Sequence, residues 1–323
     1  MDSTGRRAVG PLLALVLVGA VLGAVVGTMA WMLDVRGAPP DRRDQQATDR
    51  PSKAPPLQRD VVATVGVASY NALRHLPLRR AARDWRLLTG RDDLDLIGWQ
   101  ESKSPAFREL YPRFEDRGWS TWHHPVPDGP ISLAVSWRQD TFELLDVGYV
   151  RMHRGGYPRE TDAPFPARWV VNAEFRHRDS GRAVTLLNTH VNQTIETGQR
   201  FQDNLNAAFA KRHLRRLAGL WNTAPGDVVV GTGDFNFDHA DDSEARPPGG
   251  ISRRFEGEAV SSYDALGLSG VVPTRNTRWI DYVWLSTDSL VRGGGTAQFA
   301  THRSLGGYHS DHRPMLARIR LYR

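Results

Sequence analysis

Two features in the C-terminal part of the chain have the residue types for acid–base chemistry. Residues 309–314 read His-Ser-Asp-His-Arg-Pro, so Asp311 stands beside His312, a combination suited to metal ligation or general-base catalysis. The alternative for this stretch is a polar loop with an incidental histidine. Asp281 is a lone carboxylate within the apolar segment Trp279–Trp284. Because a buried carboxylate is unfavourable without a partner, we expect Asp281 to be paired, most naturally with a histidine.

A second candidate group follows the apolar run Val228–Val230. The chain continues Gly-Thr-Gly-Asp-Phe-Asn, which places Asp234 and Asn236 where a buried strand is expected to end. The flanking glycines would let the backbone approach a ligand closely. The structural alternative is an Asx turn that closes the strand, and this segment by itself does not decide between the two.

Three further polar residues also follow apolar runs. His190 lies within Asn-Thr-His-Val-Asn at residues 188–192, although a lone histidine at a strand end is more often structural than catalytic. Asn71 and Glu101 each follow an apolar run in the N-terminal half. The Glu101 carboxylate is a hard oxygen donor of the kind that Mg²⁺ or Mn²⁺ prefers. Polar groups at buried strand ends are unfavourable unless they are paired or bind something, so all three are candidate site residues.

The elements that must position these residues begin at Val61, where short apolar runs start to alternate with polar turns. Two helices are predicted, Leu76–Leu88 with an arginine-rich side and Arg200–Trp221 with an apolar stripe, and residues 238–257 are predicted to form a surface loop. Many strands with few interposed helices favour two packed sheets with flanking helices. The predicted strands are Val61–Ala68, Leu94–Trp99, Ile131–Trp137, Trp169–Phe175, Ala183–Asn188, Asp227–Val230, Ile280–Leu285 and Met315–Leu321.

The N-terminal part predicts export. The uncharged apolar run Ala8–Leu33 has 26 residues, more than the roughly 20 that a membrane-spanning helix needs. Arg6 and Arg7 before it predict a cytoplasmic N-terminus and an extracytoplasmic C-terminal domain in a single-pass protein of the cell membrane. The alternative is a signal peptide cleaved after Ala30, which would make the protein secreted. The predicted division is an anchor or signal at 1–33, a disordered linker at 34–60 and one globular domain at 61–323.

Composition sets further bounds on function. The 323 residues include 42 Lys and Arg against 36 Asp and Glu, and the net charge of +6 argues only weakly for a polyanionic partner. Almost all of the basic residues are arginines, which suit bidentate phosphate contacts but can equally reflect genome base composition. The absence of cysteine excludes disulfides, thiolate metal sites and a cysteine nucleophile.

The polar motifs occur in an order that resembles a known superfamily. Along residues 61–321 they are strand-Asn, strand-Gln-Glu, Asn-Thr-His-x-Asn, Gly-Asp-Phe-Asn, Ile-Asp-Tyr and Ser-Asp-His-x-Pro. No single motif is specific, but together they resemble the endonuclease/exonuclease/phosphatase superfamily, which includes deoxyribonuclease I. The resemblance implies an α/β (α+β) fold. In it two mixed β-sheets pack face to face between helices as a four-layer sandwich, with the active site at one end.

The resemblance also implies a metal site and a general base. By motif position, Glu101 would be the principal Mg²⁺ (or Mn²⁺) ligand, assisted by Asn71 and Asp311. His312 would activate water, with Asp281 holding its ring and stabilising its cation. Such an enzyme would hydrolyse phosphoesters.

The remaining motif residues would act on the phosphate. Asp234 and Asn236 would contact the scissile phosphate or the attacking water, and His190 would stabilise developing charge or protonate the leaving oxygen. One departure affects His190: in the nuclease branch a glutamate from a nearby strand supports this histidine, and the matching strand near residues 131–135 contains none.

Substrate and partners stay open at this point. Arg168 and Asn192 are candidate substrate contacts. A nuclease acting on DNA or RNA is one interpretation, and a phosphodiesterase for phospholipid or sphingolipid head groups, or a small-molecule phosphatase, is another. A catalytically silent binding domain is a third. We expect a monomer with a phosphoester substrate, with membrane contact through the N-terminal helix and with no protein partner.

Overall fold

The computed structural model describes residues 59–125, 129–156, 165–198, 200–242, 245 and 250–323. Residues 57–323 form one compact unit with its own hydrophobic cores. The predicted anchor or signal at 1–33 and linker at 34–60 lie almost wholly outside the described residues. Within the described part of the chain, no helix is long and apolar enough to cross a membrane.

The first sheet has six strands in the order β11-β12-β1-β2-β4-β3. Only β1 and β2 are parallel neighbours in it, and the other pairs are antiparallel. The strands are β1 (Val61–Asn71), β2 (Leu96–Gln100), β3 (Trp119–His123), β4 (Ala134–Arg138), β11 (Ala297–Ser304) and β12 (Met315–Tyr322).

The second sheet also has six strands, in the order β5-β6-β7-β8-β10-β9. Here β7 and β8 are the parallel pair. The strands are β5 (Phe142–His153), β6 (Arg168–His177), β7 (Ala183–His190), β8 (Val228–Asp234), β9 (Ala259–Ser261) and β10 (Asp281–Ser286).

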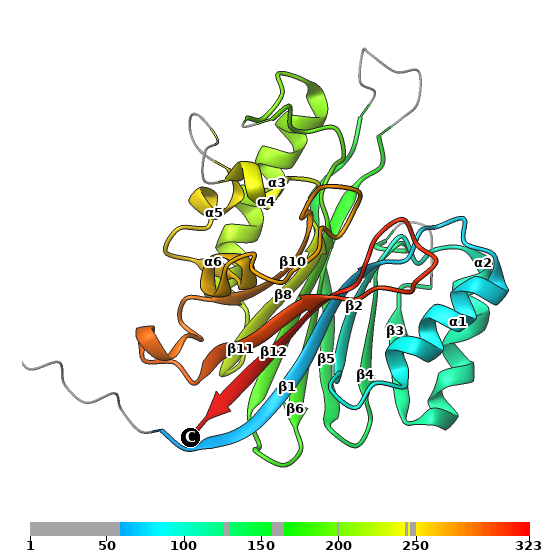
Figure 1. The fold of residues 1–323 in the computed structure, drawn as a ribbon, viewed down its shortest axis with the longest axis vertical. Coiled ribbons are helices and arrows are strands. Elements are labelled where there is room, and N and C mark those ends of the chain that lie inside the picture. The colour runs from blue at the N-terminus through cyan, green and yellow to red at the C-terminus, as the bar shows by residue number, and fades with distance from the viewer. Residues whose placement is uncertain (1–58, 126–128, 157–164, 199, 243–244, 246–249) are drawn as a thin grey trace, which may run out of the picture. The chain divides into compact units, whose positions relative to one another are not determined.

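Helices cover the outer side of each sheet (Figure 1). The helices α1 (Leu78–Thr89) and α2 (Pro105–Leu110), with the 3₁₀ helix η1 (Tyr111–Arg117), flank the first sheet. The second sheet is flanked by α3 (Leu205–Thr223), α4 (His239–Asp242), α5 (Ile251–Arg254) and α6 (Ser262–Leu266), and a short 3₁₀ helix η2 (Val291–Gly293) precedes β11. The predicted four-layer sandwich is confirmed.

Alternation along a single strand shows how the layers are built. On β1, Val65 and Val67 belong to the core between the two sheets, while Ala68 and Tyr70 belong to the core under α1. Successive strand side chains point to opposite faces, so a strand that is buried on both sides reads as a continuous apolar run. In the outer core, Trp85 of α1 stacks on Trp99 of β2 with ring centroids 4.1 Å apart.

Two sequence predictions differ from the structure. The predicted loop at 238–257 contains the short helices α4 and α5. The four strands β3, β5, β9 and β11 were not predicted, and each of them is an edge strand of its sheet. Of the residues of β5 only Phe142, Met152 and His153 are buried, so this strand lacks the continuous apolar run by which the interior strands were recognised.

Candidate active site

The polar motifs meet where two parallel strand pairs end. In the first sheet Asn71 is opposite Gln100 across β1 and β2, and Glu101 follows directly. In the second sheet His190 is opposite Asp234 across β7 and β8. Ligand sites in α/β folds form at the carboxyl ends of parallel strands, because the chain there leaves the sheet and exposes its end groups. The two sheets bring these ends together.

Asp234 is the centre of the cluster and is almost fully buried, at 1% exposure. Its Oδ2 accepts a hydrogen bond from Asn71 Nδ2 (2.9 Å) and lies 3.3 Å from His190 Nε2, while its Oδ1 accepts one from the Asn236 amide (3.0 Å). His312 Nε2 is 3.9 Å from the same Oδ2. Burial raises the pKa of Asp234, but His190 and His312 lower it by more, so it is held well below its usual value.

The partner that Asp281 requires is His312. The ring Nδ1 lies 2.8 Å from Asp281 Oδ2, and both residues are buried. Burial raises the pKa of Asp281. Burial lowers the pKa of His312, but Asp281 and Asp234 together raise it to about 9. The pair leaves His312 Nε2 facing Asp234 and the rest of the cluster.

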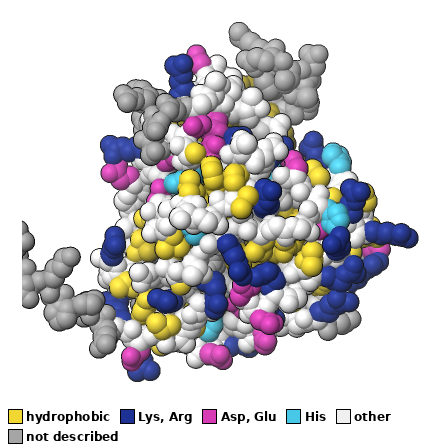
Figure 2. All heavy atoms as spheres, viewed as in Figure 1, with side chains coloured by type: hydrophobic (Ala, Val, Ile, Leu, Met, Phe, Trp, Pro, Cys, Tyr) yellow, Lys and Arg dark blue, Asp and Glu magenta, His cyan; other side chains and the backbone are white. Residues whose placement is uncertain are grey.

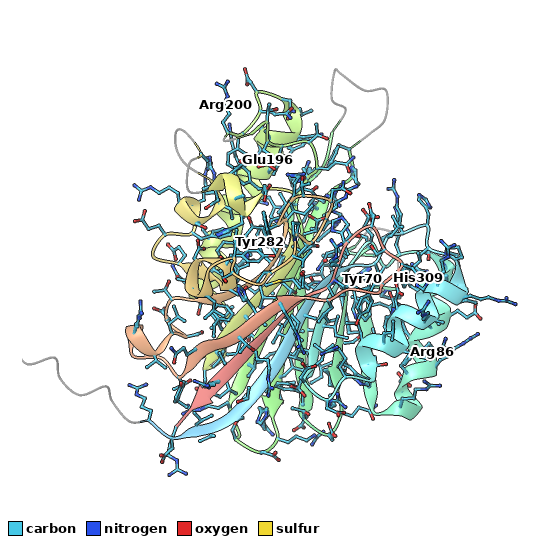
Figure 3. The ribbon with its side chains drawn as sticks, in the orientation of Figure 1. Tyr70, Arg86, Glu196, Arg200, Tyr282 and His309 are labelled. Carbon is cyan, nitrogen blue, oxygen red and sulfur yellow. The ribbon has the colours of Figure 1, made fainter. Side chains whose placement is uncertain are left out.

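The loop that carries His312 is attached to both β1 and α1. Ser310 Oγ donates to the Asn71 carbonyl (2.7 Å), and the His312 amide donates to Ser310 Oγ (3.1 Å). On the other side, Asp84 of α1 lies 2.7 Å from His309 Nδ1. Figure 3 shows His309 beside α1, close to Tyr70. The short segment from His309 to His312 is therefore held by β1 through Ser310, by α1 through His309 and by Asp281 through the His312 ring.

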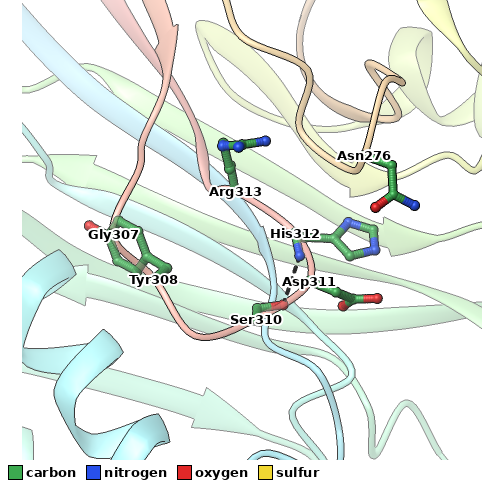
Figure 4. Close-up of a pocket in the computed structure, with 7 residues that line it drawn as sticks. All are labelled: Asn276, Gly307, Tyr308, Ser310, Asp311, His312 and Arg313. Atoms are coloured by element: carbon green, nitrogen blue, oxygen red, sulfur yellow. Dashed lines mark hydrogen bonds between the residues drawn. The ribbon is translucent and has the colours of Figure 1, made fainter.

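A surface pocket of about 260 Å³ opens beside His312. Figure 4 shows the His312 ring pointing toward Asn276, with Asp311 on the near side of the loop. Asp311 is exposed and pairs with Arg275 at 3.0 Å. The pocket is lined by Asn276, Gly307, Tyr308, Ser310, Asp311, His312 and Arg313.

Strained backbone gathers at the same place. Leu73, Glu101 and Asn236 have left-handed φ values of 55°, 57° and 53°. This region is unfavourable for residues other than glycine, and such strain persists where the surrounding structure enforces it, most often at functional sites. Two of the three are motif residues that the sequence had placed at strand ends.

Arg168 contributes a half-buried guanidinium whose Nε is fully buried. Burial lowers its pKa to about 10, while the nearby carboxylates of Asp234 and Glu101 oppose this fall. Among the described residues Arg168 forms no ion pair, and its Nε is buried without a hydrogen-bond partner. A half-buried cation in this state suits an anionic ligand.

Asn192 belongs to a buried network behind His190. Its Oδ1 lies 2.8 Å from His153 Nε2, and its Nδ2 is buried with no partner in the described part of the chain. His153 stacks on Phe209 with centroids 4.6 Å apart, and burial lowers its pKa to about 4. Sequence reasoning missed His153, because nothing distinguishes a histidine at the end of an edge strand. His190 Nδ1 likewise has no partner among described residues, in keeping with the absent supporting glutamate.

A second network ties the sheets together beneath the site. Gln100 Nε2 donates to Asn188 Oδ1 (2.8 Å), which also accepts from Thr232 Oγ1 (3.1 Å). Asn188 Nδ2 donates to the carbonyls of Trp99 and Ala134 (2.9 and 3.0 Å). These buried amides were present in the predicted motifs as neighbours of the candidate residues, and the structure gives them the role of fixing one sheet against the other.

The residues present fit a divalent cation. Ligand atoms of Asp234, Asp281 and His312 all lie within 4.8 Å of one another, and Asp281 Oδ1 is buried without a hydrogen-bond partner. The short distance between Asp281 and His312 is due to the hydrogen bond that joins them. The other oxygen donors are Asn71, which is bonded to Asp234, and Glu101, whose Oε2 accepts the Arg74 amide at 3.2 Å. Oxygen donors of this kind suit Mg²⁺ or Mn²⁺.

Comparisons with known proteins bear on the fold. No protein-family model matches the chain, and no curated protein matches it. Among solved structures, Danio rerio TDP2 complexed with single-strand DNA product is similar with a TM-score of 0.59 and 15% identity over 80% of this chain and 99% of that one. An endonuclease/exonuclease/phosphatase from Bacteroides vulgatus is similar with a TM-score of 0.59 and 17% identity, over 80% of this chain and 99% of that one. The Bacteroides thetaiotaomicron mannosyl-6-phosphatase is similar with a TM-score of 0.54 and 16% identity, over 79% of this chain and 99% of that one.

At sequence identities of 15–17%, these comparisons show the fold alone. The order of motifs, the two mixed six-stranded sheets and the match over nearly the full length of each of these structures agree. The chain has the deoxyribonuclease I-like fold of the endonuclease/exonuclease/phosphatase structures, with a buried cluster of aspartates and histidines at the end of the sandwich where the parallel strands stop.

Proposed function

We propose that this protein is a divalent-metal-dependent phosphoester hydrolase. The observation that carries the proposal is the buried cluster in which Asp234 contacts Asn71 and His190 and faces the His312–Asp281 pair. A binding module has no need for a buried histidine with an orienting acid, so this pairing speaks against a catalytically silent domain.

In the proposed reaction His312 takes the proton from the attacking water. Its Nδ1–H donates to Asp281, which fixes the tautomer and leaves Nε2 free to accept. Asp281 stabilises the imidazolium that forms, since the carboxylate is buried beside it. Asp234 and Asn236 orient the water or the scissile phosphate from the opposite sheet.

The other buried donors serve the phosphate and the leaving group. Arg168 and Asn192 have nitrogen atoms without hydrogen-bond partners among the described residues, and phosphoryl oxygens would satisfy them. His190 lies 3.3 Å from Asp234 and stabilises charge on the leaving oxygen.

A bound Mg²⁺ or Mn²⁺ would be held by Glu101, Asn71 and Asp234. When bound, it would offset charge on the phosphoryl oxygens and oppose the rise in the pKa of His312 that the carboxylates cause. Asp311, paired with Arg275 and exposed, is the weakest of the ligands implied by the motif order.

Within this class we favour a phosphodiesterase that acts on nucleic acid. Support comes from the similar TDP2 structure, which is complexed with single-strand DNA product, while a mannosyl-6-phosphatase of the same fold keeps monoester hydrolysis as the second candidate. Lipid head groups are a third. The apolar run at 8–33 supports a further proposal, that the domain works outside the cytoplasm on a membrane anchor or as a secreted protein.

One assay series tests the proposal. Residues 57–323 would be given Mg²⁺ or Mn²⁺ and, in parallel, bis-p-nitrophenyl phosphate, p-nitrophenyl phosphate, single-stranded DNA, RNA and sphingomyelin. The variants are His312→Ala and, as the control, His123→Ala, a histidine on edge strand β3. We expect hydrolysis that only His312→Ala abolishes. No turnover of any substrate, or equal turnover by His312→Ala, would refute the proposal.

A further inference from the structure

The outer side of α1 carries arginines that the proposed reaction centre does not use. Arg79, Arg83 and Arg86 stand at i, i+4 and i+7, so they form one line along the helix, and Arg80 flanks them. All four are exposed, whereas the opposite side of the helix is buried on Trp85 and its neighbours. We call these four residues the arginine stripe.

The arginine stripe has no acidic partner in the part of the chain that the structure describes. Within the described ranges none of its members forms an ion pair, and Arg83 contacts only His309, with NH1 3.4 Å from Nε2. By contrast, Arg113 on the neighbouring η1 is paired with Glu109. The one acidic residue of α1, Asp84, is buried. Like charges at this spacing weaken a helix, so an unneutralised stripe calls for an anionic partner.

The stripe is linked to the active-site loop through Arg83. His309, which Arg83 contacts, lies three residues before His312 on the same loop. Arg74, just before α1, donates its amide to Glu101. Figure 2 shows dark blue side chains gathered over α1 and α2, and Figure 3 shows His309 beside α1 and Arg86 farther along the helix. Positive charge therefore runs from the cluster outward along α1.

We propose that the arginine stripe binds the phosphodiester backbone of a nucleic-acid strand whose scissile phosphate lies at the Asp234 cluster. This inference rests on the proposed function and specifies its substrate. Arg79 and Arg86 are seven residues apart, which is about 10 Å along the helix and matches roughly three phosphates at the 3.4 Å axial spacing of one strand. The contact between Arg83 and His309 favours a ligand that continues from the reaction centre over a lipid surface that touches α1 alone.

Binding and kinetics of two matched double variants of residues 57–323 test this. Arg79→Gln/Arg86→Gln removes two charges from the stripe but spares Arg83. Arg176→Gln/Arg178→Gln removes the same charge at the end of β6 opposite Arg168. For a fluorescent 12-nucleotide DNA we expect the stripe variant to raise Kd on the order of tenfold at low salt, and to reduce the slope of log K against log salt by about 1.4.

The control double variant should bind the 12-mer as the wild type does. Both variants should bind a dinucleotide and hydrolyse bis-p-nitrophenyl phosphate like the wild type, because neither ligand reaches α1. Equal 12-mer affinity in the two variants overturns the inference. It is also overturned if the stripe variant binds the 12-mer normally but loses affinity for phosphatidylserine vesicles, a result that would assign the stripe to an anionic membrane. If the wild-type protein binds the 12-mer through the stripe but hydrolyses no phosphoester, the proposed function is refuted and the inference that the stripe binds nucleic acid still stands.

Discussion

Asp84 of α1 accepts hydrogen bonds from both the backbone amide and the ring of His309, at 2.9 Å and 2.7 Å. The same carboxylate accepts the hydroxyl of Tyr70 at 2.8 Å. Tyr70 directly precedes Asn71 on β1, and His309 directly precedes Ser310, so one buried carboxylate holds both β1 and the loop that carries His312. It is a positioning residue, since it reaches the reaction centre only through its neighbours.

Asp84→Asn should therefore lower kcat by about ten- to a hundredfold with little change in KM, because the His312 loop shifts. It should also lower the free energy of unfolding by about 1–3 kcal/mol through lost charge-assisted hydrogen bonds. Steady-state kinetics and urea denaturation measure the two effects. Tyr70→Phe removes one of these bonds without touching His309, so a matching fall in kcat there would mean that the loss follows stability and not loop position.

Asp281→Asn should lower kcat by about two to four orders of magnitude, because the amide no longer holds the His312 ring in the accepting tautomer. Circular dichroism should show an unchanged fold. The comparison is Asp95→Asn, a buried carboxylate that accepts the Gly66 amide at 2.8 Å and lies outside the cluster. If both variants lose activity equally, Asp281 has no special role.

Metal should stabilise the folded domain as well as activate it. At a Mg²⁺ concentration of 100 times Kd the free energy of unfolding should rise by about 2.7 kcal/mol, since the ion binds the folded state only. EDTA should reverse this and abolish turnover. Thermal melts of wild type and of Glu101→Gln measure it. An undiminished shift in Glu101→Gln would remove that residue from the ligand set.

Gly98→Ala should destabilise the sandwich by about 1–3 kcal/mol. A Cβ on Gly98 of β2 would lie 2.0 Å from Thr232 Oγ1 and 2.7 Å from Asn188 Oδ1 on the facing sheet. Gly148→Ala on β5 is the matched control, because a Cβ there meets nothing within 4 Å. Urea denaturation measures the free energy of unfolding of both variants. Equal values would mean that the two sheets can move apart at Gly98 without a cost in stability.

Acid should destabilise the domain through its buried histidines. Burial lowers the pKa of His153 from 6.5 to about 4. Between pH 6.5 and about pH 4 the histidine is therefore protonated in the unfolded state and neutral in the folded state. The contribution of this group is complete above pH 6.5 and is lost progressively as the pH falls toward 4. His153→Gln should flatten the fall in unfolding free energy over this window. A slope identical to wild type in urea melts at several pH values would show that His153 stays protonated in the folded protein.

The eight strands predicted from apolar runs are the eight interior strands of the two sheets, and the four that were not predicted are the four edges. The reason is physical. An interior strand is covered on both faces and flanked on both sides, so it requires a continuous apolar run. An edge strand such as β5 leaves one side open, and its residues Leu145, Tyr149 and Val150 are partly exposed.

The sequence by itself indicated which residues are candidates for chemistry, because Asp281 inside an apolar strand requires a partner and Asp234 follows a buried strand with glycines beside it. It also determined the order of the motifs and, from them, the fold. The motif order already implied that the partner of Asp281 is His312, and the structure confirms this contact. Only the tertiary structure decided that Asn71 from the other sheet donates to Asp234 and that Asp84 anchors the loop that carries His312. Each of these contacts joins residues from distant elements, and register, sheet packing and the position of α1 set their distances, none of which a local pattern contains.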